Sequence, residues 1–264
     1  MTEVDKYEPG SFSWVDLQTT DAESGKRFYT ELFGWELEDM PAGDMGVYTM
    51  FRLRGRDVAA LSGMGPQFEG IPPHWNSYVT VDDVDACAKS AADLGGNVMM
   101  EPADVMDSGR MAAVQDPSGG VVMLWEPRNH IGAGIRDEPG SLTWIELLTR
   151  DIEAAKRFYT KLFGWGTESM DMGDMDTGDP YTVFTRGDQT AGGLFRLGED
   201  MRDVPPNWSV CFAIDDIDPT VSRAEELGGR IIVPPMDIPK VGRYATLADP
   251  QGAVFSLLQP PEQP

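Results

Sequence analysis

The chain has 264 residues, of which 41 % are hydrophobic, and a formal net charge of −23. This composition excludes an intrinsically disordered protein, and the charge repels phosphate backbones and acidic lipid surfaces, so no nucleic-acid partner is expected. The sequence has no run of about 18 apolar residues, no visible signal peptide and only 2 cysteines, without a CxxC pair. We therefore expect a cytoplasmic protein with no membrane partner.

In chain order, the first predicted element is an alternating strand, Phe12–Thr19. Asp21 fits the N-cap of a helix whose apolar face carries Phe28 and Leu32, and Gly34 is placed to end this helix. Two or three strands follow, with a hairpin turn predicted at residues 53–57. Strands and a helix in this order, without strict βαβα alternation, indicate the α+β class.

The same pattern recurs further along the chain. Residues 9–35 and 139–165 are identical at 17 of 27 positions, at an offset of 130. Residues 75–83 match 208–216 at an offset of 133, so the second copy carries three additional residues, which we place near 170–179. Within each copy, a fainter repeat relates the capping residues Asp21 to Asp83 and Asp151 to Asp216.

The repeats predict two tandem domains, each built from two βαβββ modules. The glycine-containing stretch between the two domains is expected to be a linker. The predicted boundaries are residues 9–128 for the first domain, with modules at about 9–65 and 72–128, residues 129–138 for the linker, and residues 139–260 for the second domain, with modules at about 139–198 and 204–260.

Strand parity separates an apolar face from a face that is rich in aromatic and polar side chains. In the first strand, Val15 and Leu17 should pack on the helix, whereas Trp14 and Asp16 share the opposite face. The second copy repeats this arrangement with Trp144 and Glu146. A sheet that is covered by helices on one side and curves around such residues on the other describes a ligand cavity. Taken singly, each tryptophan could instead be a core aromatic.

These features resemble the glyoxalase/bleomycin-resistance, or vicinal oxygen chelate, superfamily. The resemblance depends on the strand–Asp–helix unit that ends in Phe28-Tyr29…Gly34-Trp35 and Phe158-Tyr159…Gly164-Trp165, and on the turns Asp116-Pro-Ser-Gly and Asp249-Pro-Gln-Gly. It implies that each domain curves into an open, barrel-like sheet around a cavity. The chain is similar in particular to the tandem two-domain type common in actinobacteria. The resemblance implies no single reaction, because this fold hosts several.

The resemblance also implies where a divalent metal would bind. The corresponding positions are Trp14, Asn76 and Met123 in the first domain, and Trp144, Ser209 and Ser256 in the second. These are poor metal ligands, and the chain has only two histidines, His74 and His130. We therefore expect no metal and no cofactor.

The candidate residues for function include strand residues on the face of Asp16 or Glu146, further aromatic residues on or near these strands, and two arginines that follow a glycine at equivalent places of the two copies. Asp16 and Glu146 are the candidate catalytic groups. The candidate ligand-binding residues are Trp14, Tyr48, Trp75, Asn76, Tyr78, Arg110, Met123, Trp125, Trp144, Trp208, Arg243 and Tyr244. The side chains around Glu146 are smaller than those around Asp16 and include no His or Asn at the metal positions. Arg110 and Arg243 could instead form ion pairs with the many carboxylates.

Three functions remain open at this point. The first is a binding protein that holds an organic metabolite or an antibiotic in an aromatic-lined cavity. The second is a metal-independent lyase or isomerase, or a hydroxylase-type tailoring enzyme, in which Asp16 or Glu146 acts as a general base. The third is a regulatory or interaction protein without catalysis. In each case the expected partner is a small organic ligand, and the chain is expected to be a monomer or a homodimer.

Overall fold

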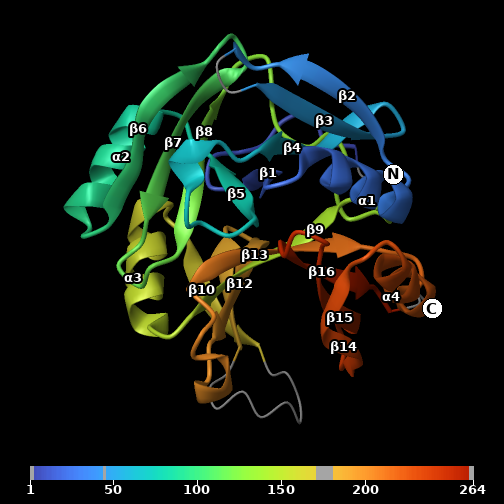
Figure 1. Ribbon diagram of the computed structural model, residues 1–264. Coiled ribbons are helices and arrows are strands. Elements are labelled where there is room, and N and C mark those ends of the chain that lie inside the picture. Colours follow the sequence, from blue (N-terminus) through green and yellow to red (C-terminus); the bar gives the residue numbers. More distant parts are fainter. Residues whose placement is uncertain (1–2, 44–45, 171–180, 262–264) are drawn as a thin grey trace.

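The computed structural model describes residues 3–43, 46–170 and 181–261, and shows two α+β domains of the same architecture in tandem (Figure 1). Each domain is an eight-stranded sheet with two helices on one face. The sheets are curved but are not closed barrels, and each module has the order βαβββ. The three additional residues of the second copy were predicted near 170–179, and all of that stretch except Met170 lies outside the described residues.

The first domain contains two modules, and its elements in chain order are β1 (Phe12–Thr19), α1 (Ala22–Phe33), β2 (Glu36–Pro41), β3 (Val47–Leu53), β4 (Arg56–Gly63), β5 (His74–Thr80), α2 (Val84–Asp93), β6 (Asn97–Val105), β7 (Gly109–Gln115) and β8 (Val121–Pro127). Its strand order is β2-β3-β4-β1-β5-β8-β7-β6. The central strands β1 and β5 run antiparallel, so the two modules meet in the middle of the sheet.

The second domain repeats this order, with the elements β9 (Leu142–Thr149), α3 (Ile152–Leu162), β10 (Gly166–Met170), β11 (Tyr181–Arg186), β12 (Gln189–Arg196), β13 (Asn207–Ala213), α4 (Ile217–Glu226), β14 (Arg230–Ile238), β15 (Gly242–Ala248) and β16 (Val254–Gln259). Its strand order is β10-β11-β12-β9-β13-β16-β15-β14. A short 3-10 helix precedes the second module of each domain, at Pro66–Phe68 and Glu199–Met201.

The helix and turn signals predicted from the sequence are confirmed. The side chains of Asp21 and Asp151 accept hydrogen bonds from the backbone N–H of Ser24 and Ala154, each at the start of a helix. Gly34 follows α1 in the left-handed conformation, at φ 70°, as a C-terminal cap requires. The predicted turn at residues 53–57 joins β3 to β4.

The two domains pack back to back through the helix-bearing faces of their sheets. Phe12 of the first domain lies against Trp208 of the second, with ring centroids 4.8 Å apart, and one continuous core cluster contains buried residues of both domains. The Tyr29 hydroxyl donates to Asp249, and the Tyr159 hydroxyl donates to Asp116, so the same buried contact is made twice across the interface. The concave face of each sheet, called the inner face below, therefore points away from the other domain (Figure 1).

The stretch predicted as a linker packs on the first domain. The backbone N–H of Ala133 donates to the carbonyl of Ser13 at 2.8 Å, and that of Gly134 donates to the carbonyl of Asp57 at 2.7 Å. Ala133 is fully buried, and Ile135 pairs with Glu3 in an isolated β-bridge. Residues 133–135 are therefore held against the first domain, whereas the backbone N–H of Asp137 donates to the carbonyl of Leu142 of the second.

Among the described residues, no helix is long and apolar enough to cross a membrane.

Candidate functional site

The predicted parity of the central strands is confirmed. Val15 and Leu17 lie in the core cluster with the helices, whereas Trp14 lies in a second cluster on the inner face of the first sheet. This second cluster contains the buried residues Trp14, Met50, Ala60, Tyr78, Ala113, Met123, Trp125 and Ala133, with Tyr48, Met100, Val105 and Met111 packed against it. The inner face of the first domain is therefore filled by the protein's own side chains.

Asp16 is buried within this filled face, where both of its carboxylate oxygens accept hydrogen bonds. The Asn76 amide donates to Oδ1 at 2.8 Å, and the hydroxyls of Tyr78 and Tyr48 donate to Oδ2 at 2.7 and 3.1 Å. Burial raises the pKa of Asp16, while these hydrogen bonds and the charge of His74 oppose that rise. Asp16 is thus fully engaged with its own domain.

His130 of the linker covers the edge of the first domain's inner face. Its ring meets the Trp14 ring edge-on, with centroids 4.6 Å apart, and its carbonyl accepts a hydrogen bond from the Trp125 indole at 2.9 Å. Trp14 and Trp125 are only 3 % and 5 % exposed. The prediction that these two rings line an open cavity is therefore wrong, and the core-aromatic alternative holds for them.

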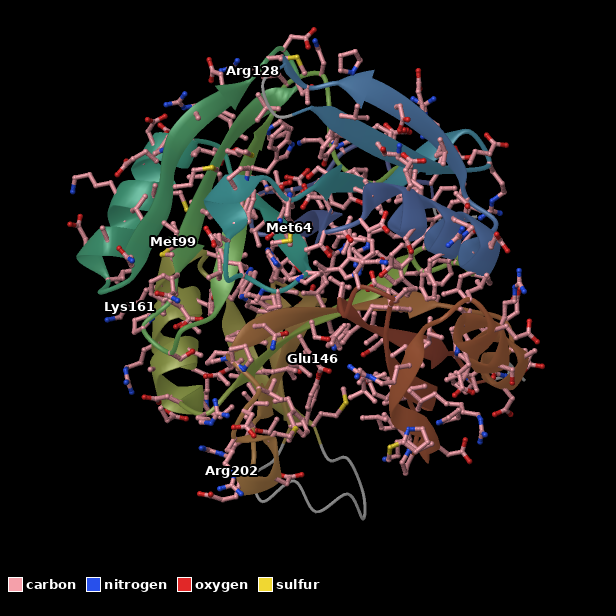
Figure 2. All side chains as sticks on the ribbon, in the orientation of Figure 1. Met64, Met99, Arg128, Glu146, Lys161 and Arg202 are labelled. Atoms are coloured by element: carbon pink, nitrogen blue, oxygen red, sulfur yellow. The ribbon has the colours of Figure 1, made fainter. Side chains whose placement is uncertain are left out.

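The inner face of the second domain is different, because its central residues reach solvent. Glu146 and Trp144 are both partly exposed, and Figure 2 shows Glu146 on the inner side of the sheet, between the arm formed by β10–β12 and the arm formed by β14–β15. The Tyr181 hydroxyl donates to Glu146 Oε2 at 2.9 Å and accepts from the Trp144 indole at 2.9 Å. Among the described residues, Glu146 Oε1 has no hydrogen-bond partner.

Gly193 allows Tyr181 to reach Glu146. Gly193 lies on β12 opposite Glu146, and a Cβ atom at this position would be 1.9 Å from the Tyr181 hydroxyl. A side chain at this position would therefore displace the Tyr181 hydroxyl from the place it takes here. The equivalent residue in the first domain is Ala60, opposite Asp16 on β4.

The strand registers show why the second inner face is more open. Four large residues of the first domain are replaced at the equivalent positions by smaller ones. The pairs are Met50 and Val183, Tyr78 and Cys211, Met123 and Ser256, and Trp125 and Leu258. The loss of these side chains exposes the face around Glu146.

Hydroxyl groups line the side of the second inner face that β15 and β16 form. Tyr244 and Ser256 hydroxyls lie 2.7 Å apart, and Thr246 is within 3.1 Å of both. Burial and the nearby Glu146 charge raise the pKa values of Tyr244 and Tyr181, so both phenols stay neutral and can donate hydrogen bonds. Tyr244, one of the candidate residues from the sequence, is partly exposed on this face.

Four residues chosen from the sequence lie away from the inner faces. Trp75 and Trp208 are in the core between the domains, where their indoles donate to the hydroxyls of Tyr29 and Tyr159. Arg110 pairs with Asp85 and Asp104, and Arg243 pairs with Asp218 and Asp237. The prediction that Trp75 and Trp208 contact a ligand is wrong, because their parity is opposite to that of Asn76 and Ser209 and places them in the core. Arg110 and Arg243 form the ion pairs that the sequence analysis gave as their alternative, and their contact with a ligand stays a prediction.

The residues of the inner faces do not fit the family's metal site. In the second domain, the positions implied by the resemblance are Trp144, Ser209 and Ser256, and the one carboxylate nearby is already bound by Tyr181. Within the described part of the chain, no three His, Cys, Asp or Glu residues cluster so that they could hold an ion. These residues therefore lack the set of His and carboxylate ligands that a tightly bound divalent ion needs.

The sequence reasoning missed Tyr181, Gly193 and Cys211 as residues of the second inner face. A signal for Tyr181 was present, because it stands 133 positions after Tyr48, the offset that relates the later parts of the two domains. Cys211 is buried, and strand register places it on the inner face beside Ser256.

Comparison with known proteins agrees with this architecture. The model of the Glyoxalase/Bleomycin resistance protein/Dioxygenase superfamily matches residues 11–124 and 141–257. The chain is 46 % identical to the "Putative glyoxylase CFP32" of Mycobacterium bovis over the whole of both chains. It is 38 % identical to the "Anthracycline biosynthesis protein DnrV" of Streptomyces peucetius, covering 96 % of this chain and 94 % of the relative.

Among solved structures, the Mn(II)-bound glyoxalase of Novosphingobium aromaticivorans is similar in fold, with a TM-score of 0.65 and 18 % sequence identity, over 95 % of this chain and 82 % of that one. The tandem sheets, their module order and both matched segments lead to one conclusion: the chain belongs to the glyoxalase/bleomycin-resistance/dioxygenase superfamily.

Proposed function

We propose that the chain binds a small organic molecule on the inner face of its second domain, without a metal ion, and that Glu146 accepts a hydrogen bond from this ligand. The observation that carries the proposal is the state of the Glu146 carboxylate. One oxygen is held by Tyr181, and the other has no partner among the described residues. Because this oxygen is accessible and the described residues leave it without a partner, a ligand that donates a hydrogen bond can take the place of water there.

The surroundings of Glu146 suit a ring-containing ligand with polar substituents. Trp144 offers a partly exposed aromatic surface, and the partly exposed Tyr244 and Thr246 offer hydroxyls. Apolar surfaces with a few placed polar groups are typical of small-molecule sites. The name of one relative, an anthracycline biosynthesis protein, associates that protein with a ring-containing organic metabolite.

The first domain serves as a scaffold in this proposal. Asp16 has partners on both oxygens, and its inner face is filled and covered by His130. Its role is to build the core that it shares with the second domain.

A probe without charge tests the proposed site. We expect 1-naphthalenemethanol, which combines a flat ring with one hydroxyl, to bind with one site per chain in isothermal titration calorimetry. Leu258→Trp restores the larger residue of the first domain and is expected to weaken binding at least about tenfold by filling the face, whereas the chelator EDTA changes nothing.

Leu37→Trp is the matched control for this substitution. It makes the same change on edge strand β2, where Leu37 is 45 % exposed and belongs to neither inner face. The proposed site is excluded if the probe does not bind, or if Leu258→Trp and Leu37→Trp bind it equally well.

A second candidate function is catalysis of proton abstraction by Glu146. Burial raises the pKa of Glu146, and a carboxylate with a raised pKa and an accessible oxygen is suited to act as a general base near neutral pH. Glu146→Gln separates the two functions once a natural ligand is known: an enzyme loses turnover while it retains binding, and a binding protein shows no turnover in either form.

A further inference from the structure

The charges around the two inner faces differ in a way that restricts the ligand. In both sheets, one row of directly paired residues crosses the inner face. The row in the first domain runs Glu38–Met50–Ala60–Asp16–Asn76, and the row in the second runs Glu168–Val183–Gly193–Glu146–Ser209. Each row therefore carries two carboxylates, one on the edge strand and one at the centre.

The first domain places a basic residue near each carboxylate of its row. Arg52 forms an ion pair with Glu38, with Nη1 and Oε2 2.5 Å apart. His74, at the end of β5, acts on Asp16 through its charge and opposes the rise of the Asp16 pKa. Both carboxylates of this row thus have a basic neighbour.

The second domain lacks both basic residues. At the offset of 133, the equivalents of Arg52 and His74 are Thr185 and Asn207, which carry no charge. The pKa of Glu146 is raised by burial and lowered only by the hydrogen bond from Tyr181, with no cationic side chain contributing. Within the described part of the chain, Glu168 has no ion-pair partner either. The second row is thus negative and uncompensated.

We propose, on the basis of the binding function above, that the ligand of the second domain carries a positively charged amine, which sits between Glu146 Oε1 and the ring of Trp144. An ammonium group supplies the missing positive charge and donates a charge-assisted hydrogen bond to the free oxygen. Aromatic faces such as that of Trp144 also attract cations. Anionic ligands are repelled by the two carboxylates of the row and by the net charge of −23.

Three naphthalene probes of nearly equal size test the charge of the ligand. They are 1-naphthylmethylamine, which is a cation at neutral pH, the uncharged 1-naphthalenemethanol, and the anion 1-naphthoate. Because a charge-assisted hydrogen bond is roughly twice as strong as a neutral one, the amine is expected to bind about tenfold more tightly than the alcohol. Calorimetry should detect no saturable binding of 1-naphthoate.

Two matched variants locate the charge preference. Glu146→Gln keeps the shape of the side chain but removes its charge, and it should bring the amine and the alcohol to within about threefold of each other. Asp16→Asn makes the same change in the first domain and should leave the tenfold preference intact.

The outcomes separate this inference from the function on which it rests. Equal binding of the alcohol and the amine to the wild-type chain overturns the amine ligand and leaves the binding site standing. Tight binding of 1-naphthoate, or an amine preference that survives Glu146→Gln, also overturns the inference. The absence of binding by all three probes overturns both proposals.

Discussion

Two carboxylates at equivalent strand positions, Asp16 and Glu146, show how the neighbouring residues determine the role of an acid. Asp16 accepts three hydrogen bonds from Asn76, Tyr78 and Tyr48, which use both oxygens. Glu146 accepts one, because Ser209 and Cys211 replace Asn76 and Tyr78. The same strand position is therefore structural in one domain and available to a ligand in the other.

The raised pKa of Asp16 predicts a specific pH dependence of stability. A folded-state pKa above that of the unfolded chain gives stability that is fully present below the unfolded pKa and is lost as the pH rises through the folded pKa. Asp16→Asn removes this titration. Relative to Asp16→Asn, the wild-type chain is therefore expected to lose free energy of unfolding as the pH increases across that window.

Urea unfolding of the wild-type protein and of Asp16→Asn at a series of pH values measures this difference in the free energy of unfolding. The contributions of the other carboxylates are the same in both proteins and cancel in the difference. A difference that stays constant with pH, or that grows in favour of the wild-type chain as the pH rises, would show that Asp16 does not have the assigned environment.

At the scale of elements, the linker is the feature that most distinguishes the first domain. Gly132 lies at φ 113°, and a Cβ atom there would be 2.3 Å from the Ser13 carbonyl oxygen. This close approach brings Ala133 into the inner-face cluster and His130 onto Trp14. The segment between the domains thus completes the packing of the first sheet.

Gly132→Ala is expected to displace the linker from the first sheet. Gly252→Ala is the matched control, because Gly252 has a similar φ of 103° but nothing within 4 Å of its added Cβ. Both variants carry backbone strain, and the crowding at Gly132 should cost about 1–3 kcal/mol more in the free energy of unfolding. Equal losses in denaturant titrations would mean that the linker does not depend on this contact.

The elements themselves were largely predictable because their signals are local. Asp21 and Gly34 mark the ends of α1, and alternation along Phe12–Thr19 assigns Val15 to the core and Trp14 to the inner face. The order of strands in each sheet follows from the module repeat. These features depend on residues within one or two turns or strands of each other.

The filling of the inner face was less predictable, because it depends on contacts between distant segments. Parity places Trp14 and Trp125 on one face but does not say whether a ligand or His130 covers them. Trp75 and Trp208 were assigned to the ligand because they are large aromatic residues near the predicted site, although their parity places them in the core between the domains. The sequence did indicate correctly that smaller residues surround Glu146.

At the scale of the whole molecule, the back-to-back packing explains why the two domains can differ. Trp35 donates to the Gly140 carbonyl and Trp165 donates to the Gly10 carbonyl, so each domain closes the core of the other with matching contacts. Because this shared core lies on the helix-bearing faces, substitutions on the inner faces leave it intact. One inner face could therefore be filled while the other stayed accessible.

The position of a bound probe tests this division most directly. In a crystal structure of the chain soaked with 1-naphthalenemethanol, we expect the ring on the inner face of the second sheet beside Trp144, with the hydroxyl within hydrogen-bond distance of Glu146 Oε1. A probe found between Trp14 and Trp125 of the first domain, or found only outside both inner faces, would contradict the account.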